Sequence, residues 1–267
     1  MKTRNQLIVV ILIAITFCAI VAVYALEGGS EDNGNNVSFV IDENDVSICQ
    51  AETSERSAMS SYDARANLFV KKALSDDDRD GDGVSTLDNC LKALRDRCPS
   101  GTDFPSFVLS YLQENLGYVS DQELYHSFDW AAYPIETLSL KEGDCEDFVI
   151  LFVALMERGG YYCGIALFHD HAVAMVVVEC DTSFSVDGFS PLSVEYGGQK
   201  YYAFETTENC PPGYTFEEYS SADILSFKMV SAQNCSFILK LSMFLLSIKA
   251  MKSIEGTSKV NLIINIF

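Results

Sequence analysis

The strongest constraint on the fold is an apolar run between residues 144 and 158. Asp144 precedes the run, Asp147 lies three residues later, and Gly159-Gly160 follows it. An acidic residue can cap the first turn of a helix, and glycine commonly ends one. Between these signals, residues 148–156 are apolar nearly all round. A helix that is apolar on every side is buried, so this segment predicts the central helix of the core.

Strand-like runs follow this helix at 161–168, 171–178 and 200–206, with a turn-rich stretch through Gly197-Gly198 before the last. Helical patterns precede it: one begins near Ser61, a second begins at Ser85 with Asp88 three residues later, and a third covers 103–118. A buried helix that leads into antiparallel strands is an α+β plan. We therefore expect a helical segment at 61–100 and a core domain at 101–235.

The N-terminus predicts a membrane anchor. Residues 7–26 carry no charge over 20 positions, which is long enough to span a hydrocarbon core of about 30 Å. Lys2 and Arg4 precede the run and acidic residues follow it, so the N-terminus is expected in the cytoplasm. The prediction is a signal anchor at 1–26 and a flexible stalk at 27–60, in a single-pass protein of the cell membrane. Cleavage near Ala25 is the alternative and would give a secreted chain. In both cases the remaining chain is extracytoplasmic.

The chain is strongly acidic overall, but its last 32 residues carry a net positive charge. The sequence holds 38 acidic and 18 basic residues, a formal net charge of −20. Such a surface repels phosphate backbones, so we expect no nucleic-acid partner. Residues 236–267 differ, with four lysines and one glutamate. Their apolar run, 237–248, is too short for a convincing membrane span. The sequence of this atypical tail indicates no function.

Three residues are candidates for nucleophilic chemistry. Cys145 lies at the first turn of the buried helix, where backbone N–H groups and the helix dipole favour a thiolate. His171 begins an apolar strand, which would hold its ring rigidly as a general base. Glu205 lies in an aromatic strand, where a carboxylate is costly unless it is paired, and an imidazolium would pair it. Each also has a plainer interpretation, as a buried thiol, a solvent-exposed turn residue or a strand-edge acid.

A resemblance brings these residues together. The run YPIETLSLKEGDCEDFVILFVALMERGGY (133–161), followed by HAVAMVVV and YYAFETT, resembles the transglutaminase-like superfamily over roughly residues 103–216. The resemblance implies a papain-like α+β core in which Cys145 is the nucleophile, His171 the general base and Glu205 the orienting acid. Many relatives carry Asp in place of this Glu.

The chemistry that the resemblance implies is attack on a peptide or amide carbonyl of an envelope substrate. A thioester would form and be resolved by water or by an amine, so the enzyme would be a cysteine hydrolase or acyltransferase without a catalytic cofactor. Two alternatives remain. One is an inactive binding protein that holds peptides or glycans in the same cleft. The other is a calcium-stiffened stalk or adhesion protein.

A second site is predicted in the acidic stretch DDDRDGDGVSTLDN (76–89). Asp residues occupy positions one, three and five of a calcium-loop pattern, and Gly83 occupies the sixth. Five Asp within 76–82 repel one another unless a cation is present. The predicted ligands of a structural Ca²⁺ are Asp78, Asp80, Asp82, the backbone carbonyl of Val84, and Asp88. A solvated acidic loop is the alternative.

Overall fold

The structure is a computed structural model that describes residues 37–178, 191–215 and 219–230. The elements belong to one compact unit that begins at Phe39. The predicted membrane segment at 7–26 and the tail at 236–267 lie outside the described residues. Within the described ranges, no helix is long and apolar enough to cross a membrane.

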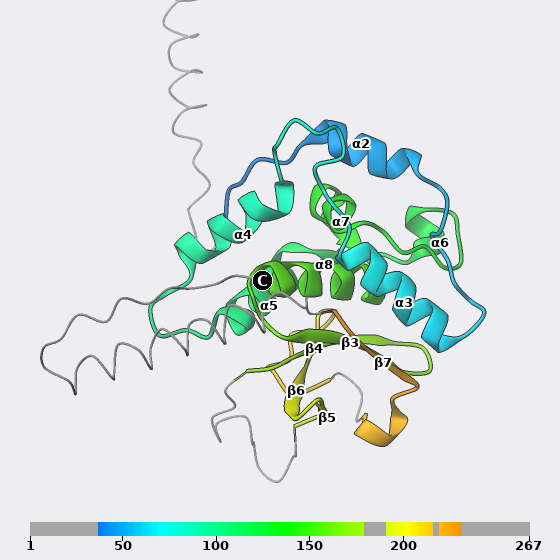
Figure 1. The fold of residues 1–267 in the computed structure, drawn as a ribbon, viewed down its shortest axis with the longest axis vertical. Helices are drawn as coiled ribbons and strands as arrows, with labels where there is room; N and C mark the ends of the chain where they lie inside the picture. The colour runs from blue at the N-terminus through cyan, green and yellow to red at the C-terminus, as the bar shows by residue number, and fades with distance from the viewer. Residues whose placement is uncertain (1–36, 179–190, 216–218, 231–267) are drawn as a thin grey trace, which may run out of the picture. The chain divides into compact units, whose positions relative to one another are not determined.

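Helices form most of the first two thirds of the unit (Figure 1). Polar side chains fix several of their starts: Ser61, Ser85 and Asp103 each accept a hydrogen bond from the backbone N–H three residues later. The predicted cap at Ser85 is thereby confirmed. The helices are α2 (Glu43–Ala51), α3 (Tyr62–Ala73), α4 (Thr86–Arg97), α5 (Phe104–Asn115), α6 (Asp121–Leu124), α7 (Pro134–Leu140), α8 (Cys145–Arg158) and the short 3₁₀ helix η2 (Ser221–Asp223).

The main sheet is antiparallel, in the order β5-β6-β4-β3-β7. A separate pair, β1 and β2, is parallel and precedes α8. The strands are β1 (Gly117–Tyr118), β2 (Glu142–Gly143), β3 (Cys163–Leu167), β4 (Ala172–Val176), β5 (Ser193–Tyr196), β6 (Gln199–Phe204) and β7 (Ser226–Met229). Helices packed on a curled antiparallel sheet confirm the predicted α+β class.

The core lies on both sides of β4. Helices α8 and α3 pack against one face of the sheet (Figure 1), where Phe152 stacks on Phe204 with ring centres 5.4 Å apart. Val173 and Met175 face the opposite side and join a second apolar cluster with Tyr201. Every residue of β4 is therefore buried, as strands covered on both faces are. This central strand fixes the backbone that directly follows His171.

The predicted flexible stalk at 27–60 is wrong for its second half. Asp42 caps helix α2, and the side chains of Val46 and Cys49 are only 2% and 1% exposed. Arg56 is also buried and pairs with Glu136 of α7. A nine-residue helix with so few apolar positions resembles a polar linker in sequence, because its stability comes from packing on α7 and not from its own pattern.

Gly164 sets how closely β3 and β7 approach. A Cβ atom at this position would lie 2.7 Å from Cε2 of Phe227 and 2.8 Å from the carbonyl oxygen of Lys228. We expect Gly164→Ala to push β7 away and lower the free energy of unfolding by about 1–3 kcal/mol, measured by urea denaturation. Gly117→Ala is the control, because its Cβ would meet neighbours at an ordinary 3.8 Å. Equal stability of the two variants would contradict this account of the strand pair.

Candidate active site at the start of helix α8

The first turn of α8 is held by Asp147. Its carboxylate accepts hydrogen bonds from the backbone N–H of Ala132, at 2.8 Å, and from that of Asp144. Asp144 is the N-cap residue, as predicted, but its side chain makes no capping hydrogen bond. The side-chain hydrogen bond at this helix start is instead the one that Asp147 accepts from the Asp144 N–H. Gly143 allows this arrangement, because a Cβ atom there would lie 2.8 Å from the Cβ of Asp147.

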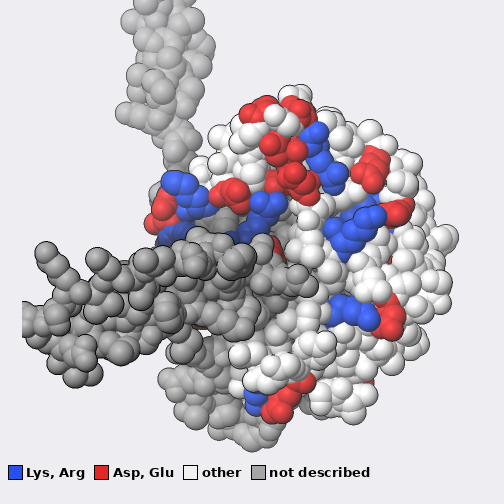
Figure 2. All heavy atoms as spheres, viewed as in Figure 1, with Lys and Arg blue, Asp and Glu red and all other residues white. Residues whose placement is uncertain are grey.

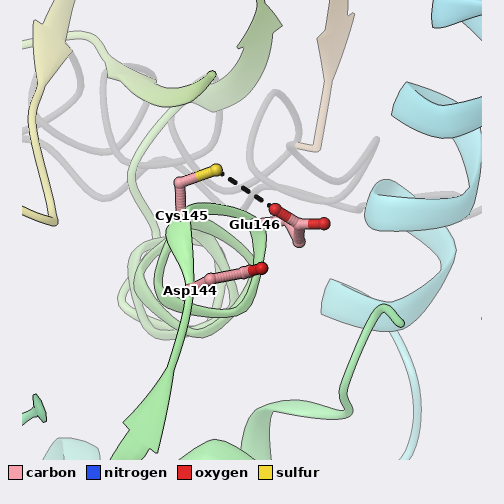
Figure 3. Close-up of side chains that lie close together, drawn as sticks. All are labelled: Asp144, Cys145 and Glu146. Atoms are coloured by element: carbon pink, nitrogen blue, oxygen red, sulfur yellow. Dashed lines mark hydrogen bonds between the residues drawn. The ribbon is translucent and has the colours of Figure 1, made fainter. Parts of the chain in front are cut away.

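Cys145 is a half-buried residue at this helix start and forms no disulfide. Its Sγ–H donates to Oε2 of Glu146 at 3.1 Å, as Figure 3 shows, and the carboxyl group of Asp144 lies nearby. The sulfur also accepts a hydrogen bond from the backbone N–H of Ala172. Because Ala172 is the first residue of β4 and directly follows His171, the fold places the thiol beside the histidine backbone.

His171 and Glu205 form a buried pair. Nε2 of His171 lies 2.9 Å from Oε2 of Glu205, and the two residues are 8% and 0% exposed. Oε1 of Glu205 accepts hydrogen bonds from the backbone N–H and the hydroxyl of Thr207, at 3.1 and 2.7 Å. Burial opposes ionisation of Glu205, but the hydrogen bond and charge of His171, together with Thr207, hold the pKa of this carboxyl below its usual value. Glu205 is therefore ionised at neutral pH.

A glutamine that the sequence did not single out supports this pair. Nε2 of Gln113, on α5, donates to the carbonyl oxygens of Glu205, Glu208 and Cys210 at 2.7, 2.6 and 3.2 Å. One amide thus fastens the segment that follows β6 to helix α5. No local pattern marks such a role, because the contacts cross more than ninety positions of sequence.

The charge state of Cys145 differs from the sequence-based expectation. Burial, the carboxylate of Glu146 and the nearby Asp144 raise the pKa of the thiol well above its ordinary value, and the Ala172 N–H opposes them only in part. The helix start was expected to stabilise a thiolate. Burial and the acidic neighbours together outweigh that contribution, so the thiol is protonated at neutral pH.

A second group of acids lies directly behind the thiol. One carboxyl oxygen from each of Asp121, Asp144 and Asp147 lies within 4.8 Å of the others, and each residue has a buried oxygen with no hydrogen-bond partner among the described residues. Burial raises the pKa of Asp121 to about 7 and that of Asp144 to about 10, and it also raises the pKa of Asp147 well above its usual value. Three such groups cannot all be ionised at this spacing. They either share protons or are suited to hold a divalent cation.

Removing the charge of Glu146 should activate the thiol. Because this carboxylate raises the pKa of Cys145, we expect Glu146→Gln to increase the rate of iodoacetamide alkylation at pH 7 by about tenfold for each pKa unit recovered. Mass spectrometry of the peptide that contains Cys145 gives this rate. The control is Glu142→Gln, a nearby exposed position. An unchanged rate in Glu146→Gln would mean that burial alone governs the thiol.

The predicted calcium ligands are brought together only in part. Carboxyl oxygens of Asp78, Asp80 and Asp82 lie within 4.8 Å of one another. Val84 follows them, and its N–H donates to Oδ1 of Asp82 at 2.8 Å. Asp88 lies in the first turn of α4 and pairs with Arg158 at 3.0 Å. Asp88 is not part of the group formed by the three loop carboxylates, and its role as a ligand stays a prediction.

Comparison with known proteins adds no relative: no family model matches the chain, and no curated protein matches it. The elements that form the candidate site are the start of α8, the start of β4 and the end of β6.

Proposed function

We propose that this chain is a transglutaminase-like cysteine hydrolase or acyltransferase that acts on peptide or amide bonds. The observation that carries the proposal is the buried hydrogen bond from His171 to Glu205, next to a backbone N–H that contacts the Cys145 sulfur. A nucleophile, a base and an orienting acid in this order are the parts of a catalytic triad. The papain-like core implied by the sequence is part of the same proposal.

The proposed reaction begins with a protonated thiol. Nε2 of His171 faces Glu205, so Nδ1 accepts the proton from Sγ of Cys145 as the sulfur attacks the substrate carbonyl. The ionised Glu205 stabilises the imidazolium that forms. Backbone N–H groups in the first turn of α8 have no partner within the helix and can donate to the oxyanion. Nδ1–H then protonates the leaving amine, and the C–N bond breaks to leave a thioester.

The second half of the reaction regenerates the enzyme. Water attacks the thioester in a hydrolase, and an amine attacks it in an acyltransferase. His171 takes the proton of the attacking group and returns it to the sulfur as the C–S bond breaks. The chemistry needs no cofactor.

The proposed location follows from the sequence. Residues 7–26 would anchor the chain in the cell membrane, with the catalytic unit outside the cytoplasm and a peptide or protein of the cell envelope as its substrate. The net charge of −20 is compatible with such an exterior and not with a nucleic-acid partner.

A comparison of envelope peptides from cells with the wild-type chain and with Cys145→Ala tests the proposal. We expect peptides with new ends, or peptides with new amide cross-links, in the wild type alone. Identical peptide sets would contradict the enzyme proposal.

A second candidate is an inactive envelope protein that binds peptides or glycans in the same cleft. The high pKa of the Cys145 thiol favours it, because a protonated thiol is a poor nucleophile. Formation of a thioester at Cys145 with an amide substrate, detected by mass spectrometry after rapid acid quenching, separates an enzyme from a binding protein.

A further inference from the structure

Carboxylates from two separate segments meet where helix α2 passes the loop before α4. Asp78, Asp80 and Asp82 form one group on the loop, and Asp80 also belongs to a group with Asp42 and Asp45 of the α2 start. In each group, one oxygen from every residue lies within 4.8 Å of the others. Figure 2 shows acidic side chains gathered over α2 and this loop.

Among the carboxylates of the two acidic groups, Asp45 gives the strongest indication of a bound ligand. Its side chain is 0% exposed. Oδ1 accepts hydrogen bonds from the backbone N–H groups of Arg79 and Asp80, at 2.7 and 3.0 Å, whereas the buried Oδ2 has no hydrogen-bond donor within the described part of the chain. Burial raises the pKa of this carboxyl. A buried carboxylate oxygen without a donor is costly, and a cation would remove that cost.

The basic side chains near this place are engaged elsewhere. Arg79, within the loop, has its guanidinium carbon 4.6 Å from the ring centre of Tyr133. Arg158 pairs with Asp77 and Asp88, at 2.6 and 3.0 Å. Among the ion pairs of the described residues, none includes a carboxylate of the two acidic groups. No Lys, Arg or His side chain of the described residues therefore pairs with these carboxylates.

The loop holds its three carboxylates through backbone donors. The N–H groups of Asp82, Gly83 and Val84 donate to Asp80, Asp78 and Asp82, respectively. Positive φ angles at Gly81 and Gly83, +78° and +87°, permit this tight path. Oxygen donors without nitrogen or sulfur suit a hard cation, and several carboxylates in a flexible geometry favour Ca²⁺ over Zn²⁺.

We propose that Ca²⁺ binds where the loop meets α2, held by Asp78, Asp80, Asp82 and the buried Asp45, and that it fastens helix α2 to this loop. Asp80 is the ligand common to both acidic groups. Asp88 is not a ligand. The site thus spans two segments that lie more than thirty positions apart in the sequence, and differs from a self-contained calcium loop by its dependence on α2.

Calorimetric titration with CaCl₂ tests the proposal by comparing calcium binding to the full-length wild type and to its Asp45→Asn variant. This variant keeps Oδ1 as an acceptor for the two backbone N–H groups and changes only the atom at Oδ2. We expect its calcium affinity to fall by about tenfold or more, which corresponds to the loss of one charged ligand. The affinity of Asp88→Asn should stay within about twofold of the wild type. Calcium should also raise the Tm of the wild type more than that of Asp45→Asn.

Two further variants keep the test decisive. Asp80→Asn changes an exposed side chain and should abolish the binding event, even if Asp45→Asn fails to fold. Asp144→Asn should leave the event intact, which separates this site from the acidic group beside Cys145. The proposal is overturned by absence of calcium binding at 1 mM in the wild type, by unchanged affinity in Asp45→Asn, or by loss of binding in Asp88→Asn.

Discussion

Replacing Glu205 with Gln should lower kcat by about 10³–10⁴-fold, the range seen when an orienting acid imposes the wrong histidine tautomer. The Thr207 N–H and hydroxyl donate to Oε1 of Glu205, so the amide oxygen of Gln must take that position. Its NH₂ group then faces Nε2 of His171 and donates to it. The proton of the imidazole moves to Nδ1, which can no longer accept the proton of the Cys145 thiol.

The tautomer can be observed without a substrate. ¹⁵N NMR of the histidine side chains should show Nε2–H for His171 in the wild type and Nδ1–H in Glu205→Gln. The matched control is Glu208→Gln, a few positions further along the same segment and exposed, which should change neither kcat nor the tautomer. Wild-type turnover by Glu205→Gln on a substrate found by peptide comparison would contradict the proposed triad.

Replacing Arg56 with Met should lower the free energy of unfolding by about 3–5 kcal/mol, the cost of leaving a buried charge without its partner. The guanidinium lies 2.5 and 3.1 Å from the two carboxylate oxygens of Glu136. It also donates to the carbonyl oxygens of Cys49, Glu52 and Ala131. Trp130 and Tyr133 cover it with their rings, at 4.8 and 4.7 Å. Urea denaturation followed by circular dichroism measures the loss.

A second substitution separates charge from packing. Arg56→Met combined with Glu136→Gln removes the orphaned carboxylate, so we expect a smaller loss than in Arg56→Met alone. Lys92→Met is the surface control, because Lys92 and Asp96 form an exposed i,i+4 pair worth about 0.3–0.5 kcal/mol. A loss of similar size in Arg56→Met and Lys92→Met would show that the buried pair does not hold α2 to α7.

The sequence predicted those parts of the fold that have strong periodicity. The run 148–156 is apolar on every side and is buried in α8. Strands β3 and β4 fall within the predicted runs, and β6 begins one residue before its run. Helix α2 and strand β7 were missed, because each is short and is stabilised by contacts with distant elements. The hydrophobic pattern of a segment predicts which of its own residues are buried. It does not predict that a short segment will be stabilised by packing against an element far away in the sequence.

The candidate site shows the same limit. The chemistry of His171 and Glu205 pointed to a pair, and the fold places them 2.9 Å apart. The protonation of Cys145 could not be anticipated, because it depends on how deeply the fold buries the thiol and on how Glu146 and Asp144 lie beside it. Gln113 and Asp45 gave no local signal. Both act through hydrogen bonds to backbone atoms of segments far away in the sequence.

The bond from Arg56 to Glu136 has a consequence for the smallest chain that can fold by itself. A fragment that starts at residue 101, the predicted border of the core domain, would keep Glu136 in the interior and lose its only salt-bridge partner among the described residues. Truncation at that border should therefore yield insoluble or loosely packed material. We therefore expect the smallest chain that folds by itself to start before Asp42 and to retain helix α2.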